Sequence, residues 1–142
     1  MELHDVDDLL IINDSYNANP ASMAAALQSL TFFAQERGGQ SWAFIGKMHE
    51  LGESGASASA DVGTLASDLG IDHFVVVNAP EYGSGVGPMQ FHHVATIADA
   101  AAFVDHISPG DVVLIKASRA ERFELLADDI KARWVIRNGV EQ

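Results

Sequence analysis

Short apolar runs alternate along the chain with longer segments in which apolar residues recur every three or four positions. Runs rich in β-branched and aromatic residues are typical of strands that helices cover on both faces. Four runs have this character and a fifth has it more weakly: residues 9–12, 42–45, 74–77 and 112–115, and then residues 91–94. The alternation predicts a mostly parallel sheet whose strands are joined by crossover helices.

Four segments carry an apolar stripe with the spacing of one helical face. The stripes are formed by Met23, Ala26, Leu27, Leu30 and Ala34, by Val62, Leu65, Ala66 and Leu69, by Ile97, Ala100, Ala101 and Val104, and by Phe123, Leu126, Ala127 and Ile130. Gly38-Gly39 and Gly70 follow the first two stripes, where a residue without Cβ can adopt the left-handed conformation that ends a helix. We therefore expect an α/β fold, a Rossmann-like three-layer sandwich with helices on both faces of a mostly parallel sheet.

Residues 46–55 and 78–88 are rich in glycine and follow neither period, so both are predicted to be surface loops. No repeat and no linker divides the sequence. A chain of 142 residues is within the usual size of one hydrophobic core. Residues 1–142 are therefore expected to form a single domain.

The chain is acidic, with a formal net charge of −12. Binding to a phosphate backbone depends on clustered Lys and Arg, so neither nucleic acid nor an anionic membrane is expected as a partner. The absence of cysteine excludes disulfides, thiolate metal ligands and a cysteine nucleophile. The first residues lack the pattern of a signal peptide and no apolar run is long enough to span a bilayer, so a cytoplasmic location is expected.

Polar segments follow three of the predicted strands at the point where each strand ends. Residues 13–20 follow the first strand, residues 46–52 the second and residues 116–119 the last. Ligands of parallel α/β sheets bind outside the carboxyl ends of the strands. We therefore expect these three loops to share one edge of the sheet and to form the candidate site.

Part of this polar character has a purely structural explanation. Asn19 followed by Pro20 has the pattern of a helix N-cap and the first helical residue. Ser118 and Glu121 have the spacing of a capping box. Capping accounts for Asn19, Ser118 and Glu121 without excluding contact with a ligand.

Capping does not account for Asp14, Tyr16 and Asn17, which place a carboxylate, a phenol and an amide within four positions. Lys116 and Arg119 are two of only 8 Lys and Arg residues, and they lie at a strand end beside a predicted helix start. Such a place suits an anion, because free backbone N–H groups and the helix dipole add positive charge. The alternative is a surface lysine and an arginine that pairs with an acid.

Other candidates have weaker patterns. His49 and Glu50 are adjacent in a glycine-flanked loop and could form an acid–base pair, although nothing in the spacing requires it and loop histidines are often simply solvated. His92 and His93 on a strand would point to opposite faces, so they cannot chelate one metal without a bend. The sequence contains no phosphate-binding loop, dinucleotide-binding turn or nucleophile elbow.

Three segments, taken in order, resemble the Mur ligase family. Residues 13–20 followed by Ser22-Met23 are similar to its D-x-Y-N-A-N-P-x-S-M segment, residues 46–53 to its G-[DE]-M-x-E-L-G-E loop and residues 116–119 to its K-[GA]-S-R end. Within the family the resemblance is to the MurF-type ligases, and it covers nearly the whole chain. Two positions depart from the pattern, because Lys47 replaces an acidic residue and Ser59 a histidine.

The resemblance implies that the chain is one part of a three-domain enzyme. MurF-type ligases combine a domain for the UDP-sugar peptide, a central ATPase domain and a Rossmann-like C-terminal domain, and the chain is similar only to the third. These enzymes use ATP and Mg²⁺ to activate the carboxylate of UDP-N-acetylmuramoyl tripeptide as an acyl phosphate, which the amine of D-alanyl-D-alanine attacks. Most contacts to ATP and Mg²⁺ come from the central domain, so the chain alone is expected to be inactive and to work with its own N-terminal and central domains.

The resemblance also implies which residues of the three loops contact ligands. The residues expected on the nucleoside side of ATP are Asp14, Tyr16, Asn17 and Asn19. The residues expected to bind the dipeptide or the transferring phosphoryl group are Lys116, Ser118 and Arg119, with Glu50 organising the second loop on the substrate side. No catalytic residue and no metal ligand is expected in this domain alone.

Three alternatives remain open from the sequence. The chain could be the equivalent domain of another Mur or folylpolyglutamate-type ligase. It could also be a flavodoxin-like or receiver-like binding module, although the third strand ends at Val77-Asn78 and lacks the acceptor carboxylate of a receiver. A small hydrolase that uses His49 and Glu50 would require turnover by this chain alone.

Overall fold

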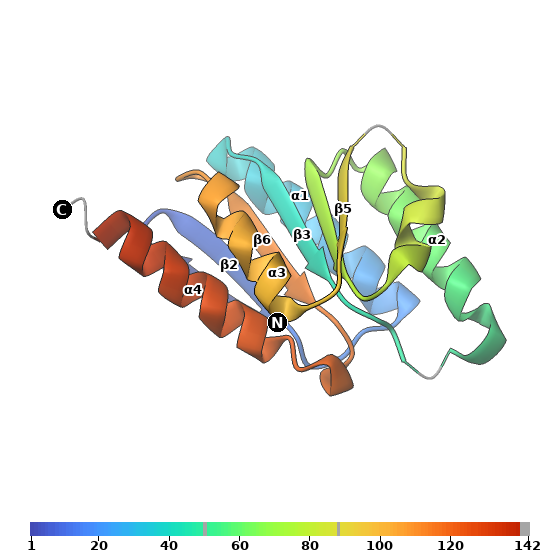
Figure 1. The fold of residues 1–142 in the computed structure, drawn as a ribbon. Helices are drawn as coiled ribbons and strands as arrows, with labels where there is room; N and C mark the ends of the chain where they lie inside the picture. The colour runs from blue at the N-terminus through green and yellow to red at the C-terminus, as the bar shows by residue number, and fades with distance from the viewer. Residues whose placement is uncertain (50, 88, 140–142) are drawn as a thin grey trace.

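The computed structural model describes residues 1–49, 51–87 and 89–139, which form one sheet between two layers of helices (Figure 1). The strand order is β1-β2-β6-β3-β4-β5, in which β1 is antiparallel to β2 and every other neighbouring pair is parallel. The strands are β1 (Glu2–Val6), β2 (Leu9–Asp14), β3 (Ser41–Ile45), β4 (His73–Val77), β5 (Gln90–Val94) and β6 (Val112–Lys116).

Helices α1 and α2 pack on one face of the sheet, and α3 and α4 pack on the other. The helices are α1 (Pro20–Arg37), α2 (Gly55–Asp68), α3 (Ile97–Ala101) and α4 (Glu124–Gly139), with short 3-10 turns η1 (Gly52–Ser54), η2 (Pro80–Gly85), η3 (Ala102–His106) and η4 (Arg119–Glu121). The predicted three-layer α/β sandwich is therefore confirmed. Within the described ranges, no helix is both long enough and apolar enough to cross a bilayer.

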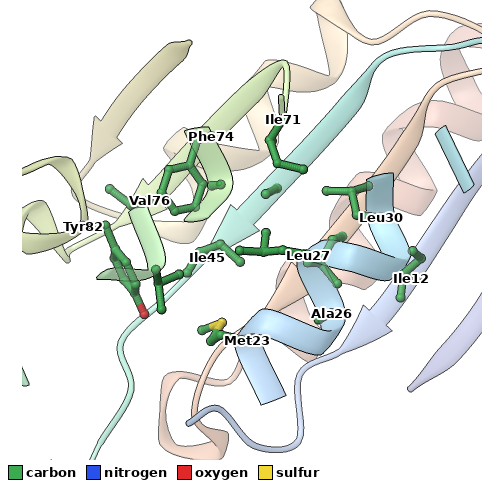
Figure 2. Packing of buried hydrophobic residues seen from close by; sticks show 14 of the residues in the cluster. Ile12, Met23, Ala26, Leu27, Leu30, Ile45, Ile71, Phe74, Val76 and Tyr82 are labelled. Carbon is green, nitrogen blue, oxygen red and sulfur yellow. The ribbon is translucent and has the colours of Figure 1, made fainter. Parts of the chain in front are cut away.

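Each strand sends alternate side chains to the two faces, so the sheet has a separate core on either side. On β2, Leu10 and Ile12 pack toward α1, while Leu9 and Ile11 pack toward α4. Figure 2 shows the first core, in which the α1 stripe that includes Leu27 meets the sheet. Each fully buried side chain of this size contributes about 1.5–3 kcal/mol, so burial on both faces holds the three layers together.

The structure differs from the sequence-based expectation in three elements. Strand β1 was not predicted, and it extends the sheet at the β2 edge. The third apolar stripe forms only a short α-helix before the chain tightens into η3, and α4 begins at Glu124, one residue after Phe123. The prediction of a surface loop over residues 78–88 was wrong for η2, because Tyr82 lies fully buried against Phe74.

The topology creates a crevice at the carboxyl ends of β2 and β6. The chain leaves β2 toward α1 on one face, whereas it leaves β6 toward α4 on the opposite face. Adjacent parallel strands whose connections diverge in this way open a cleft between their loops, and such a switch point is the usual ligand position of an open α/β sheet. The polar loops predicted from the sequence lie at this point.

Candidate functional site

The three polar loops lie along one rim of the sheet, as predicted, because β6 is inserted between β2 and β3. Lys116 is the register partner of Asp14 on one side and of Ile45 on the other. The loops after β3 and β6 are joined by backbone hydrogen bonds, from Gly46 N–H to the Lys116 carbonyl (2.9 Å) and from Ser118 N–H to the Lys47 carbonyl (2.9 Å). The rim is therefore one connected structure.

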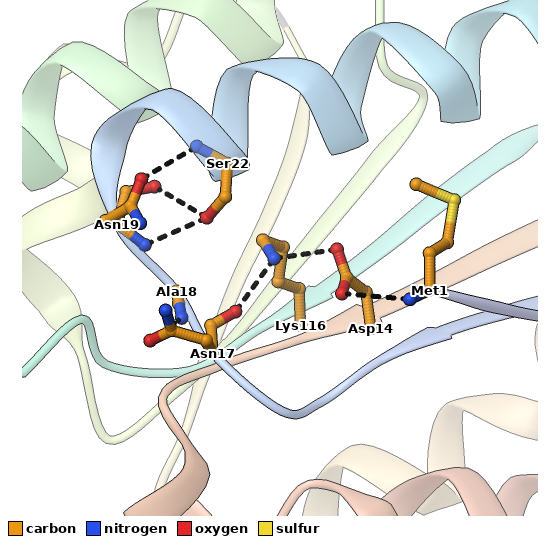
Figure 3. A network of polar contacts seen from close by, with 7 residues as sticks. All are labelled: Met1, Asp14, Asn17, Ala18, Asn19, Ser22 and Lys116. Carbon is orange, nitrogen blue, oxygen red and sulfur yellow. Dashed lines mark hydrogen bonds and ion pairs between the residues drawn. The ribbon is translucent and has the colours of Figure 1, made fainter.

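Asp14 and Lys116 form an ion pair at the centre of the rim (Figure 3). The Lys116 ammonium donates to Asp14 Oδ2 at 2.7 Å and to the backbone carbonyl of Asn17 at 2.8 Å. The Lys116 side chain is only 2% exposed and that of Asp14 is 17% exposed. Because a lysine is buried at such a place only when its charge is paired, this ion pair explains how a charged residue ends the central strand.

The loop from Asp14 to Asn19 is held mainly by its own polar side chains. The side chain of Asn17 accepts a hydrogen bond from Ala18 N–H at 2.9 Å. Asn19 caps α1 as predicted, accepting from Ser22 N–H at 2.9 Å while the Ser22 hydroxyl accepts from Asn19 N–H at 3.0 Å. Asn17 and Asn19 thus bond within the loop, whereas the Tyr16 side chain is exposed.

Tyr16 and Arg119 meet across the rim. The Arg119 guanidinium lies 5.0 Å from the centre of the Tyr16 ring, and its Nη1 donates to the Tyr16 hydroxyl at 3.4 Å. Both residues line an open cavity of about 450 Å³. The groups that give the cavity its charge and hydrogen-bonding capacity belong to Met1, Glu2, Asn13, Asp14, Ser15, Tyr16, Arg119 and Glu124. Three carboxylates face one guanidinium and the terminal ammonium of Met1, which lies 3.8 Å from Asp14 Oδ1. The lining is therefore net negative and suits a ligand that brings hydrogen-bond donors, such as sugar hydroxyls, better than one that brings bare phosphates.

Ser118 and Glu121 do not form the capping box that their spacing predicts, and this prediction was wrong. The Ser118 hydroxyl instead accepts from His49 N–H at 2.8 Å, and the Glu121 carboxylate lies 2.7 Å from His49 Nε2. The chain turns through η4 and a left-handed Arg122 (φ 57°) before α4 begins, so neither residue is at the start of that helix. Both side chains instead connect the β6 loop to the β3 loop.

Two other predictions concern histidines. The pairing of His49 with Glu50 stays a prediction, because Glu50 lies outside the described residues; the partner that the structure gives His49 is Glu121. On β5 the ring of His92 packs against Phe103 at 4.8 Å, while His93 is exposed. Over residues 1–49, 51–87 and 89–139, no group of three His, Asp or Glu side chains is arranged to hold a metal ion.

Tyr82 was not among the predicted site residues, although it contacts the rim. Its hydroxyl donates to the Gly46 carbonyl at 2.8 Å, and burial raises the pKa of Tyr82, with a smaller contribution from Glu81. Gly46 itself lies so close to the next loop that a Cβ would be 2.7 Å from both Ala117 Cβ and the Phe123 ring. An aromatic residue within a glycine-rich segment was the only signal available for this contact.

The two residues that depart from the Mur ligase pattern lie near each other. Lys47 and the buried Ser59 both line a second cavity of about 250 Å³ beside the start of α2, together with Glu81. A lysine in place of an acid therefore changes the charge of this cavity, which opens next to the β3 loop.

Comparison with known proteins gives a consistent result. Residues 1–119 match the family model of the Mur ligase, glutamate ligase domain. The chain belongs to the Mur ligase family. The match includes all six strands and ends at Arg119, so each loop of the rim falls within the Mur ligase domain.

The chain is similar in sequence to curated proteins named UDP-N-acetylmuramoyl-tripeptide–D-alanyl-D-alanine ligase. It is 35% identical to the one from Mycobacterium tuberculosis over 89% of the chain, and 36% identical to the one from Mycobacterium leprae over 92%. The Escherichia coli ligase is 31% identical over 83%. The chain spans only 29%, 29% and 26% of the length of these three relatives.

Solved MurF ligases contain the same fold. The Thermotoga maritima MurF ligase, determined in complex with ADP, superposes with a TM-score of 0.82 at 26% identity, over 96% of this chain and 31% of that one. MurF from Acinetobacter baumannii superposes with a TM-score of 0.81 at 30% identity, over 92% of this chain and 29% of that one. The Mur ligase domain therefore corresponds to a part of each larger ligase.

Proposed function

We propose that this chain is the C-terminal domain of an ATP-dependent ligase that joins D-alanyl-D-alanine to UDP-N-acetylmuramoyl tripeptide in peptidoglycan synthesis. Sequence similarity to ligases with that name, and structural similarity to MurF ligases that include an ADP complex, support the proposal. The domain works together with N-terminal and central domains of the same protein, in the cytoplasm, where ATP is available. Those domains hold most of the ATP and the Mg²⁺, which neutralises phosphate charge when bound.

The acidic cavity at the rim carries the nucleoside part of this proposal. Asp14 has a carboxylate that can accept from ribose hydroxyls, and the exposed ring of Tyr16 offers a surface for the adenine base. Asn17 and Asn19 use their side chains within the loop, so they contribute by shaping it. The cavity's carboxylates make the phosphate side of ATP a poorer fit than its nucleoside side.

The family pattern assigns the loops after β3 and β6 to the acceptor side of the reaction. Arg119 is an exposed cation that also lines the cavity beside Tyr16, and its guanidinium suits the carboxylate of the dipeptide or the transferring phosphoryl group. Ser118 holds the β3 loop through its hydrogen bond with His49 N–H. The family pattern assigns Glu50 of that loop, and Lys116, to the substrate side. Closure of this rim over the nucleotide would expel water and protect an acyl phosphate from hydrolysis.

The proposed reaction sequence places this domain at both steps. The tripeptide carboxylate attacks the γ-phosphorus of ATP and releases ADP, and the amine of D-alanyl-D-alanine then displaces phosphate from the acyl phosphate, losing a proton. The domain's residues bind and orient these groups, and none of them is required as a covalent nucleophile.

The test is a measurement of ADP and phosphate release by the full-length protein. Release should require both UDP-N-acetylmuramoyl tripeptide and D-alanyl-D-alanine, and the isolated 142-residue chain should show none. Release that depends on a single amino acid such as glutamate, instead of the dipeptide, would identify another Mur or folylpolyglutamate-type ligase. Turnover of simple esters by the isolated chain would contradict the domain assignment.

A further inference from the structure

Lys116 differs from the other charged residues of the rim because it is enclosed. It ends the central strand β6, between Asp14 on β2 and Ile45 on β3, and only 2% of its side chain is exposed. It does not line the 450 Å³ cavity, which Asp14, Tyr16 and Arg119 do line. An ammonium group in this position faces the protein's own loop instead of the space where a ligand would bind.

The two hydrogen bonds of Lys116 hold the loop after β2 near both of its ends (Figure 3). One goes to Oδ2 of Asp14, where the loop begins, and the other to the carbonyl of Asn17. The capping box of Asn19 fixes the remaining part of the loop at the start of α1. Tyr16 lies between these fixed points and is 71% exposed, so its direction is set by residues on either side of it.

We infer that Lys116 is a positioning residue for the nucleoside-facing loop and not itself a ligand of the dipeptide or the phosphoryl group. It holds one oxygen of Asp14, while the other, Oδ1, is directed toward Met1, which also lines the cavity. It also fixes the backbone that presents Tyr16. This inference rests on the proposed function and departs from the substrate-binding role that the family resemblance implies for Lys116.

The test uses the full-length ligase, with Michaelis constants measured separately for ATP and for D-alanyl-D-alanine. Lys116→Met should raise the KM for ATP on the order of 10-fold to 100-fold, because displaced contact groups cost that much even when the displacement is small. The KM for the dipeptide should stay unchanged. Asp14→Asn should have the same signature, and the double variant should lose no more than the more impaired single variant, because the two residues act as one unit. Lys131→Met, at an exposed lysine on α4, is the matched control and should change neither constant.

Two results would overturn the inference. One is a rise in the dipeptide KM with the ATP KM unchanged, which is the signature of direct substrate binding by Lys116. The other is a double variant whose loss equals the product of the two single losses, which would show that Lys116 and Asp14 act independently. Lys116→Gln, which keeps a hydrogen-bond donor, replaces Lys116→Met if the methionine variant fails to fold.

A second measurement on the 142-residue chain separates this inference from the proposed function. Amide hydrogen exchange of Ala18, whose N–H donates to Asn17 Oδ1, should accelerate at least severalfold in Lys116→Met, while the η2 segment keeps its wild-type rate. Unchanged exchange at Ala18 would refute the positioning role whatever the enzyme's activity. A full-length protein without ligase activity would instead refute the proposed function, and the exchange experiment would still decide the role of Lys116.

Discussion

The buried hydroxyl of Tyr82 donates a 2.8 Å hydrogen bond to the carbonyl oxygen of Gly46, which joins the η2 segment to the rim loop after β3. The two residues are 36 positions apart in the sequence. Because the hydroxyl lies in the core that contains Phe74, its contact with Gly46 forms where water cannot substitute for either group.

Replacing Tyr82 by phenylalanine should lower the free energy of unfolding by about 1–2 kcal/mol, because the Gly46 carbonyl loses its partner while the aromatic packing remains. Chemical denaturation measures the effect through the midpoint at an unchanged slope. An unchanged midpoint would show that water replaces the hydroxyl.

The same substitution should change how stability depends on alkaline pH. Burial raises the pKa of Tyr82 above its ordinary value near 10, so the folded protein keeps the phenol protonated where the unfolded chain has ionised. This contribution is complete below about pH 10 and is lost as the pH rises further, by up to about 1.4 kcal/mol per pH unit. The difference in unfolding free energy between wild type and Tyr82→Phe should therefore shrink above pH 10, and a constant difference would contradict the buried, neutral phenol.

Gly46 and Gly55 offer a matched pair of glycine-to-alanine substitutions. At Gly46 the new Cβ would lie 2.7 Å from Ala117 and Phe123, so Gly46→Ala should destabilise the protein by about 1–3 kcal/mol. At Gly55, at the start of α2, the nearest atom is 3.7 Å away and φ is −59°. Gly55→Ala should therefore be neutral or stabilise by up to about 1 kcal/mol. Thermal unfolding compares the two, and equal effects would mean that the β3 and β6 loops are not in close contact.

Ser118→Ala tests the connection between the β6 loop and His49. Without the hydroxyl, the His49 N–H loses its 2.8 Å acceptor, and the expected cost is about 1 kcal/mol in unfolding free energy. Ser57→Ala, at an exposed position of α2, is the control and should be neutral or slightly stabilising. If both variants behave alike, the Ser118 hydroxyl has no structural role.

The two partners of the Asp14–Lys116 ion pair should respond unequally to removal. Asp14→Asn leaves an ammonium group that is only 2% exposed, whereas Lys116→Met leaves a carboxylate that is 17% exposed and can be partly hydrated. Breaking a buried pair costs about 3–5 kcal/mol, so Asp14→Asn should fall in that range and Lys116→Met below it. Urea denaturation of both variants checks the order, and the reverse order would place the more costly desolvation at Asp14.

The parts of the fold predicted correctly are those governed by burial. Strands β2, β3, β4 and β6 are covered on both faces, so their apolar runs were visible in the sequence. Strand β1 was missed because it lies at the edge and its sequence, with Glu2 and Asp5, has too few buried positions to show a pattern. The 3-10 turn η2 was missed because Tyr82 is its one buried residue and lies among Gly83 and Gly85, so no repeating apolar pattern marks the segment.

Only those parts of the candidate site that depend on neighbouring residues in the sequence could be predicted. The three loops could be assigned to strand ends, and the Asn19 cap could be read from adjacent residues. The ion pair joins residues 102 positions apart, and it depends on β6 lying between β2 and β3, which no local pattern records. Ser118 and Glu121 show the converse. Their spacing predicted a capping box, but both side chains instead contact His49 of the β3 loop, which the local sequence does not reveal.

The position of β6 also affects how the chain folds. Strands β2 and β3 are not neighbours in the sheet, so the N-terminal half has no continuous sheet until residues 112–116 have been synthesised and inserted. Contacts of such long sequence separation form slowly, because a large loop must close before any pairing energy is gained. Insertion of β6 therefore joins β2 to β3 and brings the loops of the rim together, and a nascent chain that lacks β6 has neither the continuous sheet nor the rim.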